Sequence, residues 1–149
     1  MGNTFQEQGR LDEAIESYNK ALAIKPDFHN VYNNMGNALK KLGKVEMALE
    51  SYHKELAINV DSQQAWCNIG DLLHDQGRMQ EAVESYKKAL KIHPDSFELY
   101  YNMGVALKKQ GKLEAEAEAY NMAIAIKPDH ARAHHNLSFT LLNSGRLKE

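Results

Sequence analysis

Apolar and polar residues along the chain follow a helical pattern that glycine and proline interrupt at regular points. Each 34-residue stretch carries two amphipathic segments separated by a glycine, and such segments are typical of helices packed on one face. We expect first helices near 30–42, 64–76, 98–110 and 132–143, with a fragment at 2–8, and second helices near 12–25, 46–59, 80–93 and 114–127. Since no segment reads as a strand, the pattern predicts an all-α fold of antiparallel helix pairs.

The prolines set the length of the repeat. Pro26, Pro94 and Pro128 lie 68 and 34 residues apart, and Val60 stands where a further proline is expected. A fixed period of this size indicates a stacked array with about 4.4 repeats in 149 residues. The predicted organisation is a partial repeat at 1–28, full repeats at 29–62, 63–96 and 97–130, and a partial repeat at 131–149.

Glycine and aspartate are expected to mark the helix ends. A first column of glycines should stop helices by adopting positive φ, and it comprises Gly9, Gly43, Gly77, Gly111 and Gly145. The aspartate of each Pro-Asp pair is expected to cap the helix that follows. A second column, Gly2, Gly36, Gly70 and Gly104, lies inside helices and requires close approach of a partner helix.

Aromatic and small residues recur at positions that predict core packing. The aromatic columns are Tyr18, Tyr52, Tyr86 and Tyr120 on second helices, and Tyr32, Trp66 and Tyr100 on first helices. Two glutamates interrupt columns of alanine. Glu116 should either turn out to solvent or shift its helix, and Glu55, close to Val60, predicts looser packing of the second helix at 46–59.

Composition narrows the class of protein. A formal net charge of −2 argues against nucleic-acid binding, and the single cysteine, Cys67, excludes an internal disulfide framework. No apolar run approaches the length of a membrane span, and the chain begins directly in repeat sequence without a signal peptide. We therefore expect a cytoplasmic interaction module that binds neither nucleic acid nor membranes.

The repeat resembles a known family. The tetratricopeptide pattern of Trp, Leu-Gly, Tyr, Ala, aromatic and Pro is matched in order by Trp66, Ile69, Gly70, Leu73, Ala82, Tyr86, Ala89 and Pro94. The other repeats match nearly as well, so the resemblance covers the whole chain. It implies a right-handed superhelical solenoid whose first helices line a concave groove. It also implies binding of a partner protein or an extended peptide, with no chemistry of the array's own.

Helical geometry predicts which residues face that groove. At about 100° per residue, four positions of each first helix point away from the internal glycine. They are Asn30, Asn34, Asn37 and Lys41, then Gln64, Asn68, Asp71 and Asp75, then Glu98, Asn102, Val105 and Lys109, then Arg132, Asn136, Phe139 and Asn143. Asn34, Asn68, Asn102 and Asn136 repeat without interruption. Side-chain amides suit a peptide backbone, although hydrogen bonds within or between helices, or simple solvation, would also explain the column.

Further resemblances suggest two alternatives to a free-standing scaffold. A similar asparagine ladder lines the groove of the O-linked N-acetylglucosamine transferases, and His134 to Arg146 looks like a last repeat before a glycosyltransferase domain. The chain would then be the substrate-recognition arm of a larger enzyme. Apolar residues of the end helices, Met1, Phe5, Leu137 and Leu141, would alternatively support self-association into a homo-oligomer.

Residues that could carry chemistry are few. His130 and His134 are four residues apart, but no nearby ligand set accompanies them, so we expect surface histidines and no metal. Cys67 has no organised base beside it and is expected to be a packing residue. We therefore expect no catalytic residue and no cofactor.

Overall fold

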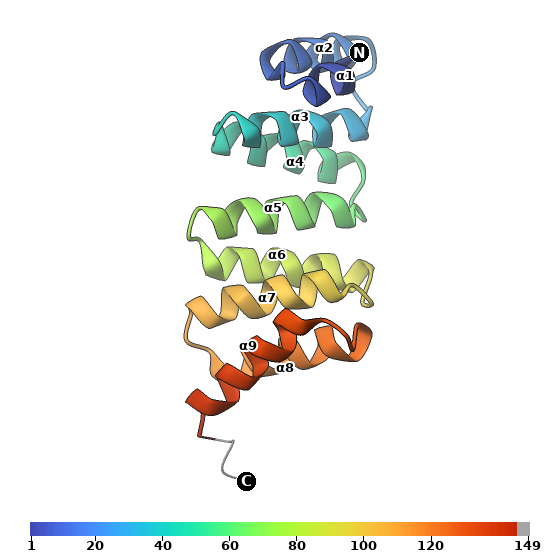
Figure 1. The fold of residues 1–149 in the computed structure, drawn as a ribbon. Helices are drawn as coiled ribbons and strands as arrows, with labels where there is room; N and C mark the ends of the chain where they lie inside the picture. The colour runs from blue at the N-terminus through green and yellow to red at the C-terminus, as the bar shows by residue number, and fades with distance from the viewer. Residues whose placement is uncertain (146–149) are drawn as a thin grey trace. The chain divides into compact units, whose positions relative to one another are not determined.

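The computed structural model describes residues 1–145, and these form helices without strands (Figure 1). The helices are α1 Gly2–Glu7, α2 Leu11–Ile24, α3 His29–Lys41, α4 Val45–Ile58, α5 Gln63–Asp75, α6 Met79–Ile92, α7 Phe97–Lys109, α8 Leu113–Ile126 and α9 Ala131–Asn143. Most begin one residue before the predicted start. The predicted all-α fold is confirmed. Residues 146–149, which include Arg146 of the predicted last repeat, lie outside the described part.

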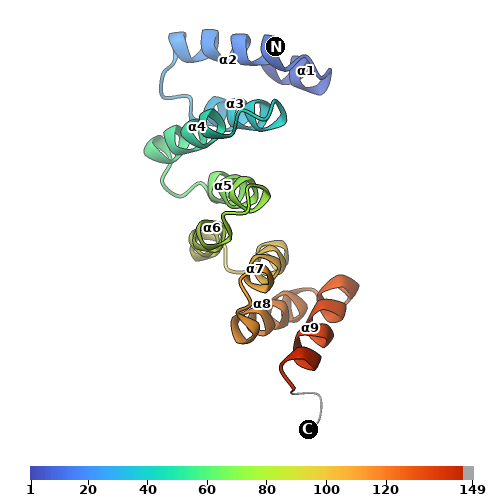
Figure 2. The same cartoon turned by 90° about the vertical axis from the view of Figure 1, so that its left-hand side faces the viewer.

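The chain divides into two compact units, Met1–Leu72 and Leu73–Glu149. The first unit holds α1 to α4 and most of α5, and the second holds the end of α5 and α6 to α9. Within each unit, helices that follow one another in the chain lie side by side, α3 beside α4 and α7 beside α8 (Figure 2). Each unit is therefore built from the helix pairs that the period predicts.

Glycine ends the helices as predicted. Gly43 has φ of 72°, and its N–H donates to Lys40 O at 3.0 Å. Lys44 N donates to Leu39 O at 2.9 Å, which completes the pair of bonds that closes a helix C-terminus around a left-handed residue. Gly9, Gly77, Gly111 and Gly145 share the positive φ.

The expected aspartate caps are wrong by one residue. Asp27, Asp61, Asp95 and Asp129 lie in the turns, and the helix begins after the next residue. Ser62 Oγ accepts from Ala65 N at 3.2 Å, and Ser96 Oγ accepts from Leu99 N at 3.4 Å. A ring nitrogen, His130 Nδ1, accepts from Ala133 N at 3.1 Å. The aspartate is displaced from the cap because it occupies the turn that redirects the chain.

A tyrosine ring explains the internal glycines. A Cβ added to Gly36 would lie 2.4 Å from Cε1 of the fully buried Tyr52, and one added to Gly104 would lie 2.6 Å from Cε1 of Tyr120. The first helix thus has no room for a side chain where the tyrosine crosses it. The aromatic residues of the first helices, Tyr32, Trp66 and Tyr100, are only half-buried, so their expected place in the core is wrong.

Neither expected outcome for Glu116 occurs. Its side chain is 1% exposed, and α8 keeps the length and register of α6. The Thr140 hydroxyl of α9 donates to Glu116 Oε1 at 2.6 Å, so a hydroxyl from the neighbouring helix accommodates the carboxylate in place. For Glu55, α4 and α6 each bury six residues at equivalent positions. The looser packing of α4 stays a prediction for hydrogen exchange.

Candidate functional site

The predicted groove residues all remain accessible. In both units these residues are exposed or half-buried. Those of the first unit are Asn30, Asn34, Asn37, Lys41, Gln64, Asn68 and Asp71, and those of the second are Asp75, Glu98, Asn102, Val105, Lys109, Arg132, Asn136, Phe139 and Asn143. On each helix the first and last of the four positions are exposed. The two middle positions are half-buried, except that Phe139 is exposed. The stripes of α3 and α5 are therefore entirely polar, whereas those of α7 and α9 each include one apolar residue, Val105 and Phe139.

Tyrosine hydroxyls orient part of this stripe. The Tyr52 hydroxyl donates to Asn37 Oδ1 at 2.8 Å, and the Tyr18 hydroxyl lies 2.8 Å from Asn3 Oδ1 at the equivalent position of α1. Burial raises the pKa of Tyr52, and the charges of Asp71 and Glu55 raise it further. The hydroxyl therefore stays protonated at neutral pH and can donate. In the second unit Val105 stands at the position equivalent to Asn37, and the Tyr120 hydroxyl instead accepts from Asn136 Nδ2 of the following first helix at 3.3 Å.

The asparagine column connects successive first helices of the first unit. Asn34 Nδ2 donates to Asn3 Oδ1 at 3.1 Å, and Asn68 Nδ2 donates to Asn33 Oδ1 at 3.0 Å. The helix-to-helix role left open by the sequence is thus present at both positions. Each side-chain amide has three or more hydrogen-bonding sites, so these bonds orient the group without exhausting it.

Asn33 is an important residue that the sequence did not indicate. Its side chain is 7% exposed, and its Oδ1 also accepts from Asn37 Nδ2 at 3.1 Å. The equivalent positions hold Cys67, Tyr101 and His135, so no periodic signal marked it.

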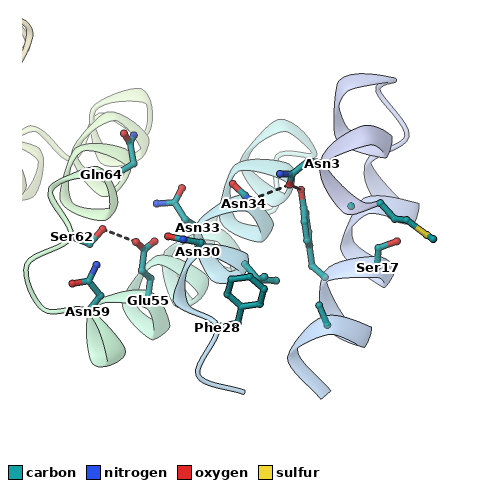
Figure 3. A pocket seen from close by; sticks show the side chains of 15 residues that line it. Asn3, Ser17, Phe28, Asn30, Asn33, Asn34, Glu55, Asn59, Ser62 and Gln64 are labelled. Carbon is teal, nitrogen blue, oxygen red and sulfur yellow. Dashed lines mark hydrogen bonds between the residues drawn. The ribbon is translucent and has the colours of Figure 1, made fainter. Parts of the chain in front are cut away.

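The first unit has a pocket of about 800 Å³ on this face (Figure 3). Three predicted groove residues line it, Asn30, Asn34 and Gln64. The sequence did not indicate the other polar lining residues, which are Asn3, Ser17, Asn33, Glu55, Asn59 and Ser62. Apolar contacts come from Phe28, Val31, Ala21 and Met1. The pocket thus combines amide groups with an apolar wall.

Glu55 is the acidic residue of the pocket wall. Its side chain is 3% exposed, and the Ser62 hydroxyl donates to its Oε1 at 2.6 Å. Its Oε2 is buried and has no hydrogen-bond partner. In the view of Figure 3 the carboxylate lies between the amides of Asn59 and Asn33. The sequence identified Glu55 as an interruption of an alanine column but did not connect it with a site.

The candidate histidines bond to a helix start and to a turn, and the candidate cysteine is half-buried. His130 caps α9, and His134 Nε2 lies 2.8 Å from Pro128 O. Burial, followed by the Asp71 charge, raises the pKa of the Cys67 thiol to about 11, which leaves little thiolate at neutral pH. Within residues 1–145 no cluster of three or more potential metal ligands occurs, and no helix is long and apolar enough to cross a membrane.

Comparison with known families identifies the repeat. A family model described as TPR repeat matches residues 2–43 and 70–111, and two tetratricopeptide repeat models match 31–65 and 97–130. The chain belongs to the tetratricopeptide repeat family. Tetratricopeptide arrays are protein-interaction scaffolds that bind partners on extended surfaces, and they generally carry no chemistry of their own. A sequence search of curated proteins finds no match.

Solved structures share the fold of this tetratricopeptide chain. MamA is 24% identical, with a TM-score of 0.90 over 98% of this chain and 85% of its own. MamA from Desulfovibrio magneticus RS-1 is 21% identical, with a TM-score of 0.87 over 99% of this chain and 83% of its own. YrrB is 19% identical, with a TM-score of 0.82 over 97% of this chain and 75% of its own. At these identities the likeness concerns the fold alone.

Proposed function

We propose that this tetratricopeptide chain holds an extended peptide segment of a partner protein in the pocket of its first unit. The observation that carries the proposal is the set of side-chain amides around one pocket, contributed by α1, α3 and the start of α5. Amides both donate to and accept from a peptide backbone, so they hold an extended chain whatever its side chains are. The apolar wall offers a place for one of those side chains.

Two further observations support a peptide ligand. Asn34 and Asn3 are already hydrogen-bonded to each other, so part of the amide set is oriented before a ligand arrives, and this lowers the entropy cost of binding. The structural neighbour YrrB is described as a TPR protein with an unusual peptide-binding site. The stripes of the second unit, around Asn102 and Asn136, offer polar contacts of the same kind within that unit.

Peptide selection with matched variants tests this function. Peptides are selected on the full chain from a random display library, and their affinities are measured by fluorescence anisotropy. Replacing two exposed amides of the pocket, Asn30→Ala with Gln64→Ala, should weaken binding about tenfold, equivalent to about 1.4 kcal/mol. The control replaces two exposed amides of second helices, Asn19→Ala with Asn121→Ala, and should leave affinity unchanged. Equal affinities for both double variants would exclude the pocket as the peptide site.

A further inference from the structure

Glu55 interrupts a column that is alanine elsewhere, at Ala21, Ala89 and Ala123. The substitution places a carboxylate, 3% exposed, on the wall of the first-unit pocket. One oxygen accepts from Ser62, and the other is buried without a partner among the described residues. None of the ion pairs found among the described residues involves Glu55.

A buried carboxylate oxygen without a partner is costly. Removing an ionised group from water is unfavourable by several kcal/mol unless a cation or several hydrogen-bond donors compensate it. Ser62 supplies one neutral donor, which satisfies only part of the four acceptor sites of a carboxylate. An occupant of the pocket that brings positive charge and further N–H donors would supply what is missing.

The rest of the pocket suits a long basic side chain. Val31, Ala21 and the ring of Phe28 provide an apolar surface for its methylene groups. Asn30, Asn59 and Gln64 offer amide oxygens for the N–H groups that do not face Glu55. A guanidinium carries five such donors and an ammonium carries three, and neither accepts a hydrogen bond.

We propose that the first-unit pocket binds a lysine or arginine side chain of the captured peptide, with the Glu55 carboxylate as its counter-charge. This proposal rests on the proposed function, because the basic side chain belongs to the same peptide. It makes Glu55 the residue that selects among peptides, while the amides hold the backbone. A metal ion is a poorer occupant, since no cluster of three potential ligands occurs within residues 1–145.

The unsatisfied oxygen alone would not carry this proposal. Glu116 Oε2 in the second unit is also buried without a hydrogen-bond partner. Glu116, however, meets Thr140 where α8 packs against α9, whereas Glu55 lines a pocket of about 800 Å³. The pocket is the observation that points to a ligand at Glu55.

The first arm of the test needs no peptide. N-acetylarginine amide, N-acetyllysine amide and the neutral isostere N-acetylcitrulline amide are titrated into the full chain. Binding is followed through the side-chain amide NMR signals of Asn30, Asn59 and Gln64. The two basic probes should bind with a dissociation constant of about 1–10 mM, as expected for so few atoms, and the citrulline probe at least tenfold more weakly.

Variants assign that preference to Glu55. Glu55→Gln keeps the shape and removes the charge, and Glu55→Ala installs the residue of the other repeats, so folding should persist in at least one of them. Both should weaken the basic probes at least tenfold. The control Glu46→Gln makes the same charge change at an exposed position of α4 and should have no effect. Absence of binding by the basic probes, equal binding of the citrulline probe, or unchanged binding by both Glu55 variants would overturn the proposal.

The second arm separates this proposal from the proposed function. Each basic residue of a selected peptide is replaced by citrulline or norleucine, and affinities are compared for the wild type and Glu55→Ala. One such replacement should weaken peptide binding to the wild type at least tenfold and should change binding to Glu55→Ala little. If the basic probes bind but peptide affinity ignores the pocket variants, peptide capture fails while the pocket's charge preference stands. If the peptide needs the pocket amides but no basic residue, the inference about Glu55 fails and peptide capture stands.

Discussion

Each unit buries one glutamate carboxylate, and the surroundings of the two carboxylates differ. Each contains one glutamate at a position that other repeats fill with alanine, and each of these carboxylates accepts a 2.6 Å hydrogen bond from a hydroxyl. In the second unit the hydroxyl comes from the next helix, and the pair lies within the helix-to-helix contact. In the first unit the hydroxyl caps α5, and the carboxylate borders a pocket. A buried charge therefore indicates a binding site only where the fold leaves space beside it.

The largest expected effect comes from removing the Thr140 hydroxyl. Thr140→Ala should lower the free energy of unfolding by about 3 kcal/mol, because it deprives the enclosed Glu116 of its hydrogen bond. Adding Glu116→Ala recreates the pair Ala82 and Ala106 of the preceding repeat, both fully buried, and should recover most of the loss. Urea denaturation measures both. A double variant less stable than Thr140→Ala would contradict this account of the contact.

The internal glycines should respond alike in both units. Gly36→Ala and Gly104→Ala should each cost about 2 kcal/mol, because overpacking against a buried tyrosine ring exceeds the helix propensity gained from alanine. Thermal and urea unfolding measure the change. Replacing the ring by a smaller side chain, Tyr52→Leu, should reduce the stability that Gly36→Ala costs, so the two substitutions together should cost less than their sum. Unequal effects at the two glycines would show that the units differ in packing as well as in their glutamates.

The smallest effect on stability is expected at Ser62, whose hydroxyl donates to Glu55. Ser62→Ala should cost about 1 kcal/mol, mainly through loss of the α5 cap. Ser96→Ala is the matched control, because Ser96 caps α7 at the equivalent position without contacting a buried glutamate. The difference between the two variants isolates the bond to Glu55 and should stay below about 1 kcal/mol. A loss at Ser62 as large as that at Thr140 would mean that Glu55 is enclosed as Glu116 is.

The repeat period predicted the helices because each element carries its own signals. Glycine requires no context to adopt positive φ, so Gly43 and its equivalents marked the helix ends correctly. The caps failed because aspartate is favoured both in turns and at N-caps, and the sequence alone does not separate the two roles. The first-helix aromatics failed because helical spacing does not say how far a neighbouring helix covers a large ring.

The candidate site was predictable only where it follows one helix. The angular positions of Asn30, Asn34 and Gln64 follow from 100° per residue, and all three line the pocket. Asn33, Asn59 and Ser62 come from other faces or from a turn, so their approach depends on how the helices pack. The interruption at Glu55 was visible in the sequence, but the seven-residue reach from Ser62 back to it depends on the path of the turn between α4 and α5.

The placement of the two glutamate–hydroxyl pairs relative to the repeat boundaries limits how the chain can be rearranged. Glu55 and Ser62 lie in the same 34-residue block, so that block can be moved to another tetratricopeptide array with the hydrogen bond from Ser62 to Glu55 intact. Glu116 and Thr140 lie in successive blocks. Duplicating residues 97–130 would place one copy of Glu116 opposite Ala106 of the next copy, and its carboxylate would lose the hydroxyl. The repeats are similar in sequence, yet only some of them are interchangeable parts.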